Sequence, residues 1–285
     1  MKKPLMLLLF PLLLPSCSYQ KADSNVLYAS FYPIYDFTQR IVQGKMTVKN
    51  LTPYGSEPHD FEPSVRQVVE MTEGKAFLAN GLSLEGYLSS LPKEVSDKTY
   101  VVTEGIETRS LNGIVDPHVW LSLPNAQKEM ERICSIVSKL DPENASYYAD
   151  NLAEEKERFS ALESQYRPKF ASMPRKTIVV SHAAFGYLCA EYGLEQIYVS
   201  GLSPSQEPSP KQLETILSLV KEKGITTVFY EELASDAIVK KIASETGAKV
   251  EILNPLEGLS QEEQKTEDYL SVMEENYRKI WEACR

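Results

Sequence analysis

Residues 141–168, DPENASYYADNLAEEKERFSALESQYRP, separate two halves of the chain and predict one long helix between them. Asp141 is a favourable N-cap residue, and Pro142 suits the first helical position. We expect Pro168 to end or kink this helix. About 25 residues at ~1.5 Å each would span roughly 38 Å, the height of a two-domain protein. Apolar residues recur at helical spacing and define one face: Tyr148, Leu152, Phe159, Leu162 and Tyr166.

Short apolar and β-branched runs alternate with helical patterns on both sides of this segment. Such alternation is typical of parallel sheets whose strands are connected by helices. The fold class that follows is α/β, with two Rossmann-like α/β lobes, mainly parallel sheets and one long interdomain helix. We expect strands near 26–31, 46–51, 76–80 and 98–102, and near 177–181, 195–199, 226–230 and 248–253.

The first residues predict an export signal. Lys2 and Lys3 precede an apolar run over 4–14, which is shorter than the roughly 20 residues of a spanning helix. The following Leu-Pro-Ser-Cys resembles a bacterial lipobox, so we expect a lipid anchor at Cys17 and a protein held in the periplasm or at the outer face of the cell membrane. The alternative is an ordinary secretory signal with an incidental cysteine.

The same features predict the organisation of the whole chain. We expect a signal peptide over 1–16, an N-terminal α/β lobe over 17–140, a linking helix over 141–173 and a C-terminal α/β lobe over 174–285. We expect the exported protein to be a monomer.

Charge and cysteine content argue against nucleic-acid binding and against a Cys-rich metal site. Removal of residues 1–16 takes away two lysines and no acid, so the net charge changes from −10 to −12. Nucleic acid is not an expected partner, because binding its phosphates requires clustered Lys and Arg. Beyond the lipobox the cysteines are Cys134, Cys189 and Cys284, whose number and spacing do not suit a Cys-rich metal site. One disulfide among them is compatible with an oxidising compartment, and the sequence does not choose the pair.

The three histidines of the chain all fall at or beyond the carboxyl ends of predicted strands. His59 lies in GSEPHDFEP, before a capping box at Ser64 and Gln67, His118 lies in DPHVW, and His182 ends the strand TIVVSH. Open α/β sheets bind ligands at this edge. Three imidazoles suit zinc, whose usual shell is tetrahedral. The sequence therefore predicts a zinc site that needs a fourth donor.

Two glutamates are candidates for that fourth donor, and water is the remaining alternative. Glu257 lies just past the last predicted strand, and Glu231 follows the seventh. Asp60 and Asp116 lie beside histidines and could orient an imidazole through its second nitrogen. Their other interpretation is as local turn residues.

Several motifs together resemble the metal-binding solute-binding lipoproteins of bacterial ABC importers for zinc and manganese. They are spread over nearly the whole exported chain. The motifs are FYPIY at 31–35, PHDFEPS at 58–64, NGLSLE at 80–85, DPHVWL at 116–121, SHAAFGY at 181–187, EPSP at 207–210 and PLEGL at 255–259.

The resemblance implies two α/β lobes joined by a long helix, with the metal in the cleft between them. The family's ligand positions match His59, His118, His182 and Glu257. Histidine at the third position is typical of zinc-type members, whereas manganese-type members carry glutamate there. The implied partners are the importer permease and its ATPase. Two departures are Ala183, where the family pattern has aspartate, and the loop 103–115, which lacks the histidine-rich stretch of many zinc-type members.

We therefore expect an extracytoplasmic binding protein that captures Zn²⁺ in an interlobe cleft and delivers it to an ABC importer, and that is not an enzyme. A manganese- or iron-specific member of the family is one alternative. A zinc-dependent hydrolase is another, because three histidines and a water also form catalytic zinc sites. No HExxH helix, serine elbow or phosphate loop supports the hydrolase.

Between the two glutamates, the residues beside Glu257 favour it as the fourth ligand. Pro255 and Gly258 allow a loop that turns its side chain sharply back into a cleft, whereas Glu231 directly follows a strand. A ligand on a loop can also move, so we expect the arriving metal to pull this loop onto the site.

Overall fold

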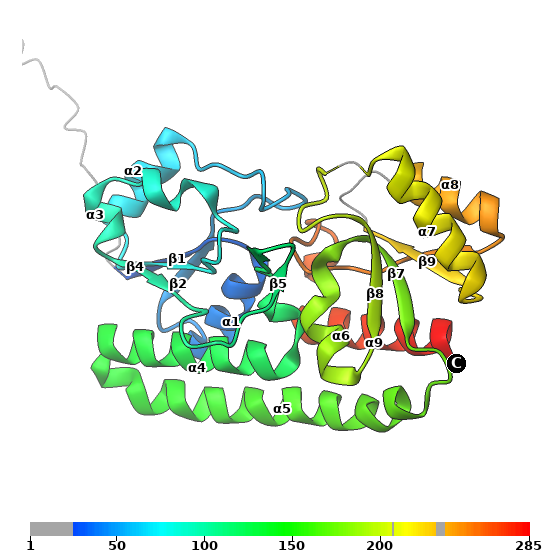
Figure 1. Cartoon of the computed structure of the whole chain (residues 1–285). Helices are drawn as coiled ribbons and strands as arrows, with labels where there is room; N and C mark the ends of the chain where they lie inside the picture. Colours follow the sequence, from blue (N-terminus) through cyan, green and yellow to red (C-terminus); the bar gives the residue numbers. More distant parts are fainter. Residues whose placement is uncertain (1–24, 207, 232–236) are drawn as a thin grey trace, which may run out of the picture.

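The structure is a computed structural model that describes residues 25–206, 208–231 and 237–285 (Figure 1). The predicted signal peptide and Cys17 lie outside the described residues. Within the described ranges, no helix is both long enough and apolar enough to cross a membrane.

Two four-stranded parallel sheets form the centres of two lobes. The first sheet has the order β2-β1-β3-β4 and the second the order β10-β9-β7-β8. All eight predicted strands are confirmed, most of them shorter than expected. They are β1 (Val26–Ala29), β2 (Thr47–Asn50), β3 (Ala76–Ala79) and β4 (Thr99–Val101), then β7 (Thr177–His182), β8 (Glu195–Ser200), β9 (Thr227–Tyr230) and β10 (Lys249–Ile252).

Helices cover both sheets, which explains why β1 and β3 are buried along their whole length. The capping boxes of Ser64 with Gln67 and of Ser209 with Gln212 start α2 and α7. The α-helices are α1 (Tyr32–Val42), α2 (Val65–Glu73), α3 (Lys93–Ser96), α4 (Leu123–Leu140), α5 (Ala145–Ser172), α6 (Gly186–Tyr192), α7 (Pro210–Glu222), α8 (Ala237–Thr246) and α9 (Tyr269–Cys284). The 3-10 helices are η1 (Gly86–Ser90), η2 (Val119–Leu121), η3 (Pro142–Asn144), η4 (Ala183–Phe185) and η5 (Glu263–Lys265).

The long helix is present: η3 leads directly into α5, so helical residues run from Pro142 to Ser172, with Asp141 and Pro142 at the predicted start. The expectation that the helix ends at Pro168 was wrong. Asp141 precedes the 3-10 turn η3, and its carboxylate accepts a hydrogen bond from Oη of Tyr148 at 2.5 Å instead of capping α5. At the other end α5 continues through Pro168 to Ser172. The proline removes a bond only to the carbonyl of the exposed Ser164, where water can replace it, and the next turn is held by the buried Phe170.

A small antiparallel hairpin interrupts the segment expected to be a loop. It consists of β5 (Ser110–Leu111) and β6 (Ile114–Val115), joined by Asn112 and Gly113. Both turn residues have positive φ, of 52° and 82°, as a two-residue type I′ turn requires.

One hydrophobic cluster passes from the first lobe through α5 into the second. It includes Leu27 and Phe37 of the first lobe, Phe159 of α5 and Ile178 of the second. Figure 1 shows α5 crossing beneath both sheets, with α9 beside it under the second. Because the lobes share buried side chains, α5 is packed into the core and does not act as a free linker. The three cysteines beyond Cys17 are all buried and unpaired.

Candidate metal centre

The three histidines and Glu257 come from four separate segments. His182 is the last residue of β7, and Glu257 lies in the loop after β10. His118 directly precedes η2, and His59 lies in the loop between β2 and α2. The fold nevertheless brings one donor atom of each within 4.8 Å of all the others.

The separations of these donor atoms match a tetrahedral zinc shell. Nε2 of His118 lies 3.2 Å from Nε2 of His59 and 3.2 Å from Nε2 of His182. Oε1 of Glu257 lies 3.3, 3.0 and 3.2 Å from Nε2 of His59, His118 and His182, respectively. A tetrahedron with metal–donor bonds of about 2.0–2.1 Å has donors about 3.3 Å apart. The four side chains therefore already have the spacing of a zinc site.

Burial differs among the four groups. The side chains of His118 and His182 are fully buried, that of Glu257 is 2% exposed and that of His59 is 10% exposed. Burial alone would raise the pKa of Glu257, but attraction to His182 and hydrogen bonds to the three histidines hold its pKa well below the usual range. The carboxylate is therefore ionised and available as a ligand.

The two buried histidines have raised pKa values. Burial opposes protonation of His118, but its hydrogen bonds to Asp116 and Glu257 outweigh burial and raise its pKa. For His182 the charges of Glu231 and Glu257 outweigh burial, and its pKa lies well above the usual value. Protons therefore compete strongly with a metal for these nitrogens.

Carboxylates hold the second ring nitrogen of both buried histidines. Nδ1 of His118 lies 2.7 Å from Oδ1 of Asp116, and Nδ1 of His182 lies 2.6 Å from Oε2 of Glu231. The main-chain N–H of His182 and the hydroxyl of Ser181 also donate to Glu231. This arrangement turns Nε2 of each ring toward the centre. It also places Glu231 behind His182, whereas Glu257 reaches the centre directly.

The His118 loop is fixed by both lobes. Nδ2 of Asn80 donates to the carbonyl of Pro117 at 3.1 Å, and Oη of Tyr187 donates to the carbonyl of Asp116 at 2.8 Å. A Cβ at Gly186 would lie 2.8 Å from Oδ2 of Asp116, so a larger residue there would have to displace the Asp116 side chain.

The surroundings of His59 differ from the sequence-based expectation. Asp60 is exposed and, among the described residues, makes no hydrogen bond to His59. The main-chain N–H of His59 instead donates to Glu57 at 3.1 Å. Burial, followed by the charge of Glu257, raises the pKa of Glu57 to about 8. Glu57 was not predicted as a site residue, although its place beside Pro58 and His59 in the motif was a usable signal.

A cavity of about 180 Å³ lies beside the centre, and of the four candidate ligands His59 alone lines it. Its walls include Leu82, Pro117 and Leu202 from both lobes and the hairpin residues Ile114 and Val115. An ion that enters through this cavity meets His59 first.

Comparison with known proteins supports a single family. Residues 27–283 match the family described as ZnuA, zinc-uptake complex component A, periplasmic. The high-affinity zinc uptake system protein ZnuA of Bacillus subtilis (strain 168) is 36% identical over 275 residues, which cover 90% of this chain and 86% of that protein. The chain spans 53–60% of the length of the streptococcal AdcA zinc-binding proteins that it matches.

Two solved structures have the same two-lobed fold. The laminin-binding protein Lmb of Streptococcus agalactiae, described as bifunctional with adhesin and metal-transporting activity, has a TM-score of 0.86 and 31% identity over 91% of this chain and 99% of that one. Zn(II)-bound AdcA of Streptococcus pneumoniae has a TM-score of 0.81 and 32% identity, and covers 92% of this chain and 58% of that one. The α/β fold class is thereby confirmed, and the chain belongs to the ZnuA family, the periplasmic A components of zinc-uptake complexes.

Proposed function

We propose that this protein captures Zn²⁺ with Nε2 of His59, His118 and His182 and Oε1 of Glu257, and delivers it to the permease of an ABC importer driven by its ATPase. The observation that carries the proposal is the spacing of these four donor atoms, which lie 3.0–3.3 Å apart in the five pairs for which the structure gives a contact. A bound ion of ordinary zinc radius would need little movement of any of them.

Asp116 and Glu231 act as orienting groups in this proposal. Each accepts from Nδ1 of a buried histidine and leaves Nε2 for the ion. Asp60, which is exposed, has no part in the proposed site.

The donor set favours zinc over manganese. Three imidazoles and one carboxylate oxygen suit a borderline metal, whereas manganese prefers a site rich in oxygen donors. We assign His182 as the residue that selects between them, because it supplies a nitrogen where a glutamate would supply oxygen.

A binding role accounts for the centre better than hydrolysis does. Catalytic zinc keeps one coordination position for water or substrate. Here the carboxylate of Glu257 occupies the fourth corner of the donor set and is buried with it. The match to a zinc-uptake component favours the same non-enzymatic role.

We propose further that the exported chain is anchored through an acylated Cys17 and functions as a monomer outside the cytoplasmic membrane. The periplasmic description of the family supports the compartment.

The proposed units of the chain are the lobes 17–140 and 174–285, with the helix 141–173 between them. The hydrophobic core that both lobes share along α5 favours limited hinge motion between them.

Calorimetry on the metal-free protein tests the proposal. Zinc should bind at one equivalent and raise the melting temperature, because a ligand specific for the native state adds about 4 kcal/mol at a thousandfold excess over its Kd. Manganese at the same concentration should give a smaller rise. An unchanged melting temperature with excess zinc would contradict the proposed function.

A further inference from the structure

The loop that carries Glu257 is held at successive main-chain positions. The N–H of Leu253 donates to the carbonyl of Tyr230 at 2.9 Å and so extends the pairing of β10 with β9. Two residues later, Nε1 of Trp120 donates to the carbonyl of Pro255 at 2.8 Å. Trp120 follows His118 closely in the chain, so this bond connects the loops that supply two of the proposed ligands.

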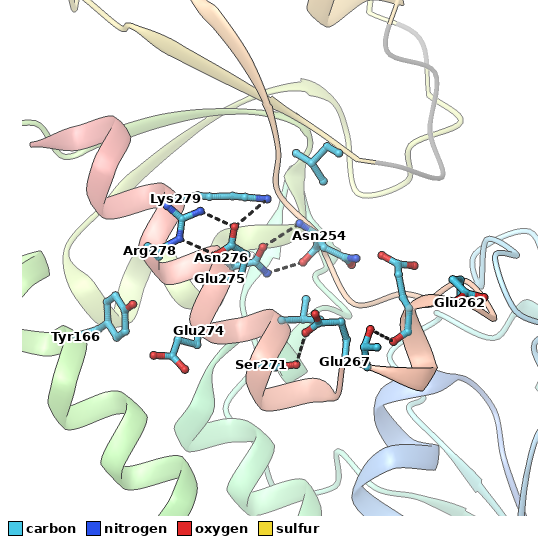
Figure 2. A pocket seen from close by; sticks show the side chains of 14 residues that line it. Tyr166, Asn254, Glu262, Glu267, Ser271, Glu274, Glu275, Asn276, Arg278 and Lys279 are labelled. Carbon is cyan, nitrogen blue, oxygen red and sulfur yellow. Dashed lines mark hydrogen bonds and ion pairs between the residues drawn. The ribbon is translucent and has the colours of Figure 1, made fainter.

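Asn276 of α9 holds the residue between these two bonds. Its Oδ1 accepts from the main-chain N–H of Asn254 at 3.0 Å, and its Nδ2 donates to the carbonyl of Asn254 at 2.6 Å. Figure 2 shows both bonds between the two labelled asparagines, beside a cavity of about 630 Å³. One side-chain amide thus satisfies both main-chain groups of a single residue, as an adjacent strand would.

Neither helix formation nor apolar packing explains an asparagine at this position of α9. Asparagine is a poor residue for a helix interior, and burying an amide costs free energy unless it is hydrogen-bonded. Asn276 is 1% exposed and lies in the same helix as the buried apolar residues Met273, Tyr277 and Ile280. The two hydrogen bonds to Asn254 compensate for the cost of burying the Asn276 amide.

The contact continues from Asn254 to the residue directly before Glu257. Oδ1 of Asn254 accepts from the main-chain N–H of Leu256 at 2.8 Å. Leu256 is fully buried and has φ of 59°, a left-handed conformation that residues with a Cβ rarely adopt. Such a conformation persists only where the surroundings impose it. The direction in which Glu257 leaves the main chain therefore depends on the Asn254 and Asn276 contacts.

We propose that Asn276 is a positioning residue for the metal centre, which holds the Glu257 loop in its ligand-presenting conformation before the ion arrives. This inference rests on the proposed function, since it takes Glu257 as a ligand. It reverses the expectation that this loop moves onto the metal. A ligand that is already in place loses little conformational freedom on binding, so the affinity is higher and the site is formed in the metal-free protein.

The test compares two buried asparagines that each bind main-chain carbonyls from a helix. Asn276→Leu removes the amide but keeps the branched shape and the number of side-chain heavy atoms. Asn276→Asp is the second variant, which keeps one acceptor but places an oxygen against the carbonyl of Asn254. Asn151→Leu is the matched control, because Asn151 is 6% exposed on α5 and its Nδ2 donates to the carbonyl of Ile41 at 2.8 Å. The readouts are the Kd for Zn²⁺, by chelator competition, and the denaturant stability of each metal-free protein.

We expect Asn276→Leu and Asn276→Asp each to raise the Kd about tenfold, the lower end of effects seen for groups that orient ligands. Asn151→Leu, at a similar loss of stability, should change the Kd by less than about threefold. In a Glu257→Ala background the effect of Asn276→Leu should nearly vanish, because Asn276 acts through that carboxylate.

Three results would overturn the inference: an unchanged Kd in both Asn276 variants, an equal loss in Asn151→Leu, or an undiminished loss in the Glu257→Ala background. In each of these cases the wild type would still bind zinc and the proposed function would stand. Failure of the wild type itself to bind zinc would overturn both proposals.

Discussion

The candidate ligands divide into an interior group and one rim residue. His118 and His182 have fully buried side chains, and a buried carboxylate holds Nδ1 of each. Glu257 is nearly as buried and lies on a loop that is held by the hydrogen bond from Trp120 to the carbonyl of Pro255. His59, by contrast, lines the cavity, and within the described part of the chain no hydrogen bond is made by its Nδ1.

This difference indicates how one site can be both prepared and accessible. The interior ligands are fixed before binding, so they contribute affinity without an ordering cost. Among the described residues the His59 ring makes hydrogen bonds through Nε2 alone, so its orientation is less constrained before an ion binds than that of the two interior rings. The geometry therefore favours an order of events in which an ion passes His59, reaches the interior three, and is then closed in by His59.

The largest effect should follow loss of an interior histidine. We expect His182→Ala to raise the Kd for zinc well beyond the roughly hundredfold limit of groups that only orient a ligand. It also leaves Glu231 buried beside an empty volume with no imidazole to pair with. Chelator competition measures the Kd, and circular dichroism checks that the variant is folded. A loss smaller than tenfold would remove His182 from the ligand set.

Loss of the rim histidine should cost less. In His59→Ala, water from the adjacent cavity can take the fourth position, so we expect the Kd to rise about 10- to 100-fold. Dissociation should be faster as well, which stopped-flow transfer of zinc to a chelator would measure. Equal losses in His59→Ala and His182→Ala would break the distinction between rim and interior.

The orienting carboxylates should give a smaller effect. We expect Asp116→Asn and Glu231→Gln each to raise the Kd at least about tenfold, because the amide no longer fixes the ring through a charged acceptor. Asp60→Asn is the matched control, since it alters an exposed carboxylate next to His59 that, in the described part of the chain, makes no hydrogen bond to the imidazole. Binding as weak in the control as in Asp116→Asn would show a general charge effect.

The smallest effect concerns pH. The pKa values of His118 and His182 are raised, so protons occupy their nitrogens at a higher pH than usual and zinc affinity should begin to fall above pH ~6.5 as the solution is acidified. Each displaced proton changes the Kd at most about tenfold per pH unit. Glu231→Gln removes the largest cause that raises the pKa of His182, so its affinity should persist to lower pH relative to its own maximum. A Kd that is constant from pH 8 to pH 6 would contradict this account.

Periodic patterns and strand ends made most of the fold and four ligand positions predictable. Strands such as β1 (VLYA) and β9 (TVFY) are short apolar or β-branched runs. Parallel strands place their carboxyl ends at one edge, which brings His182 near the loop of Glu257. The hairpin β5–β6 was missed although Asn112-Gly113 is a strong local turn signal. Asp141 and Pro142 lie at the predicted start of the helical segment, although the Asp141 carboxylate binds Tyr148 and makes no capping bond. The expected end at Pro168 was wrong because the next turn is packed into the core.

The surroundings of the ligands were less predictable than the ligands themselves. Proximity in sequence favoured Asp60 as well as Asp116, yet only Asp116 is turned toward its histidine. Glu231 follows β9, whereas His182 ends β7. The two become neighbours because β9 lies beside β7 in the sheet, an order that the sequence does not give. Asn276 lies within a helix pattern, and its contact with Asn254 exists only through tertiary packing.

A crystal structure of the zinc-loaded protein, with anomalous data at the zinc edge, tests the central claim most directly. We predict one ion bound about 2.0–2.2 Å from Nε2 of His59, His118 and His182 and from Oε1 of Glu257. The Glu257 loop should keep the contacts with Trp120 and Asn276 that it has here. A zinc ion coordinated by Glu231, or by water in place of Glu257, or bound elsewhere on the chain, would contradict the account.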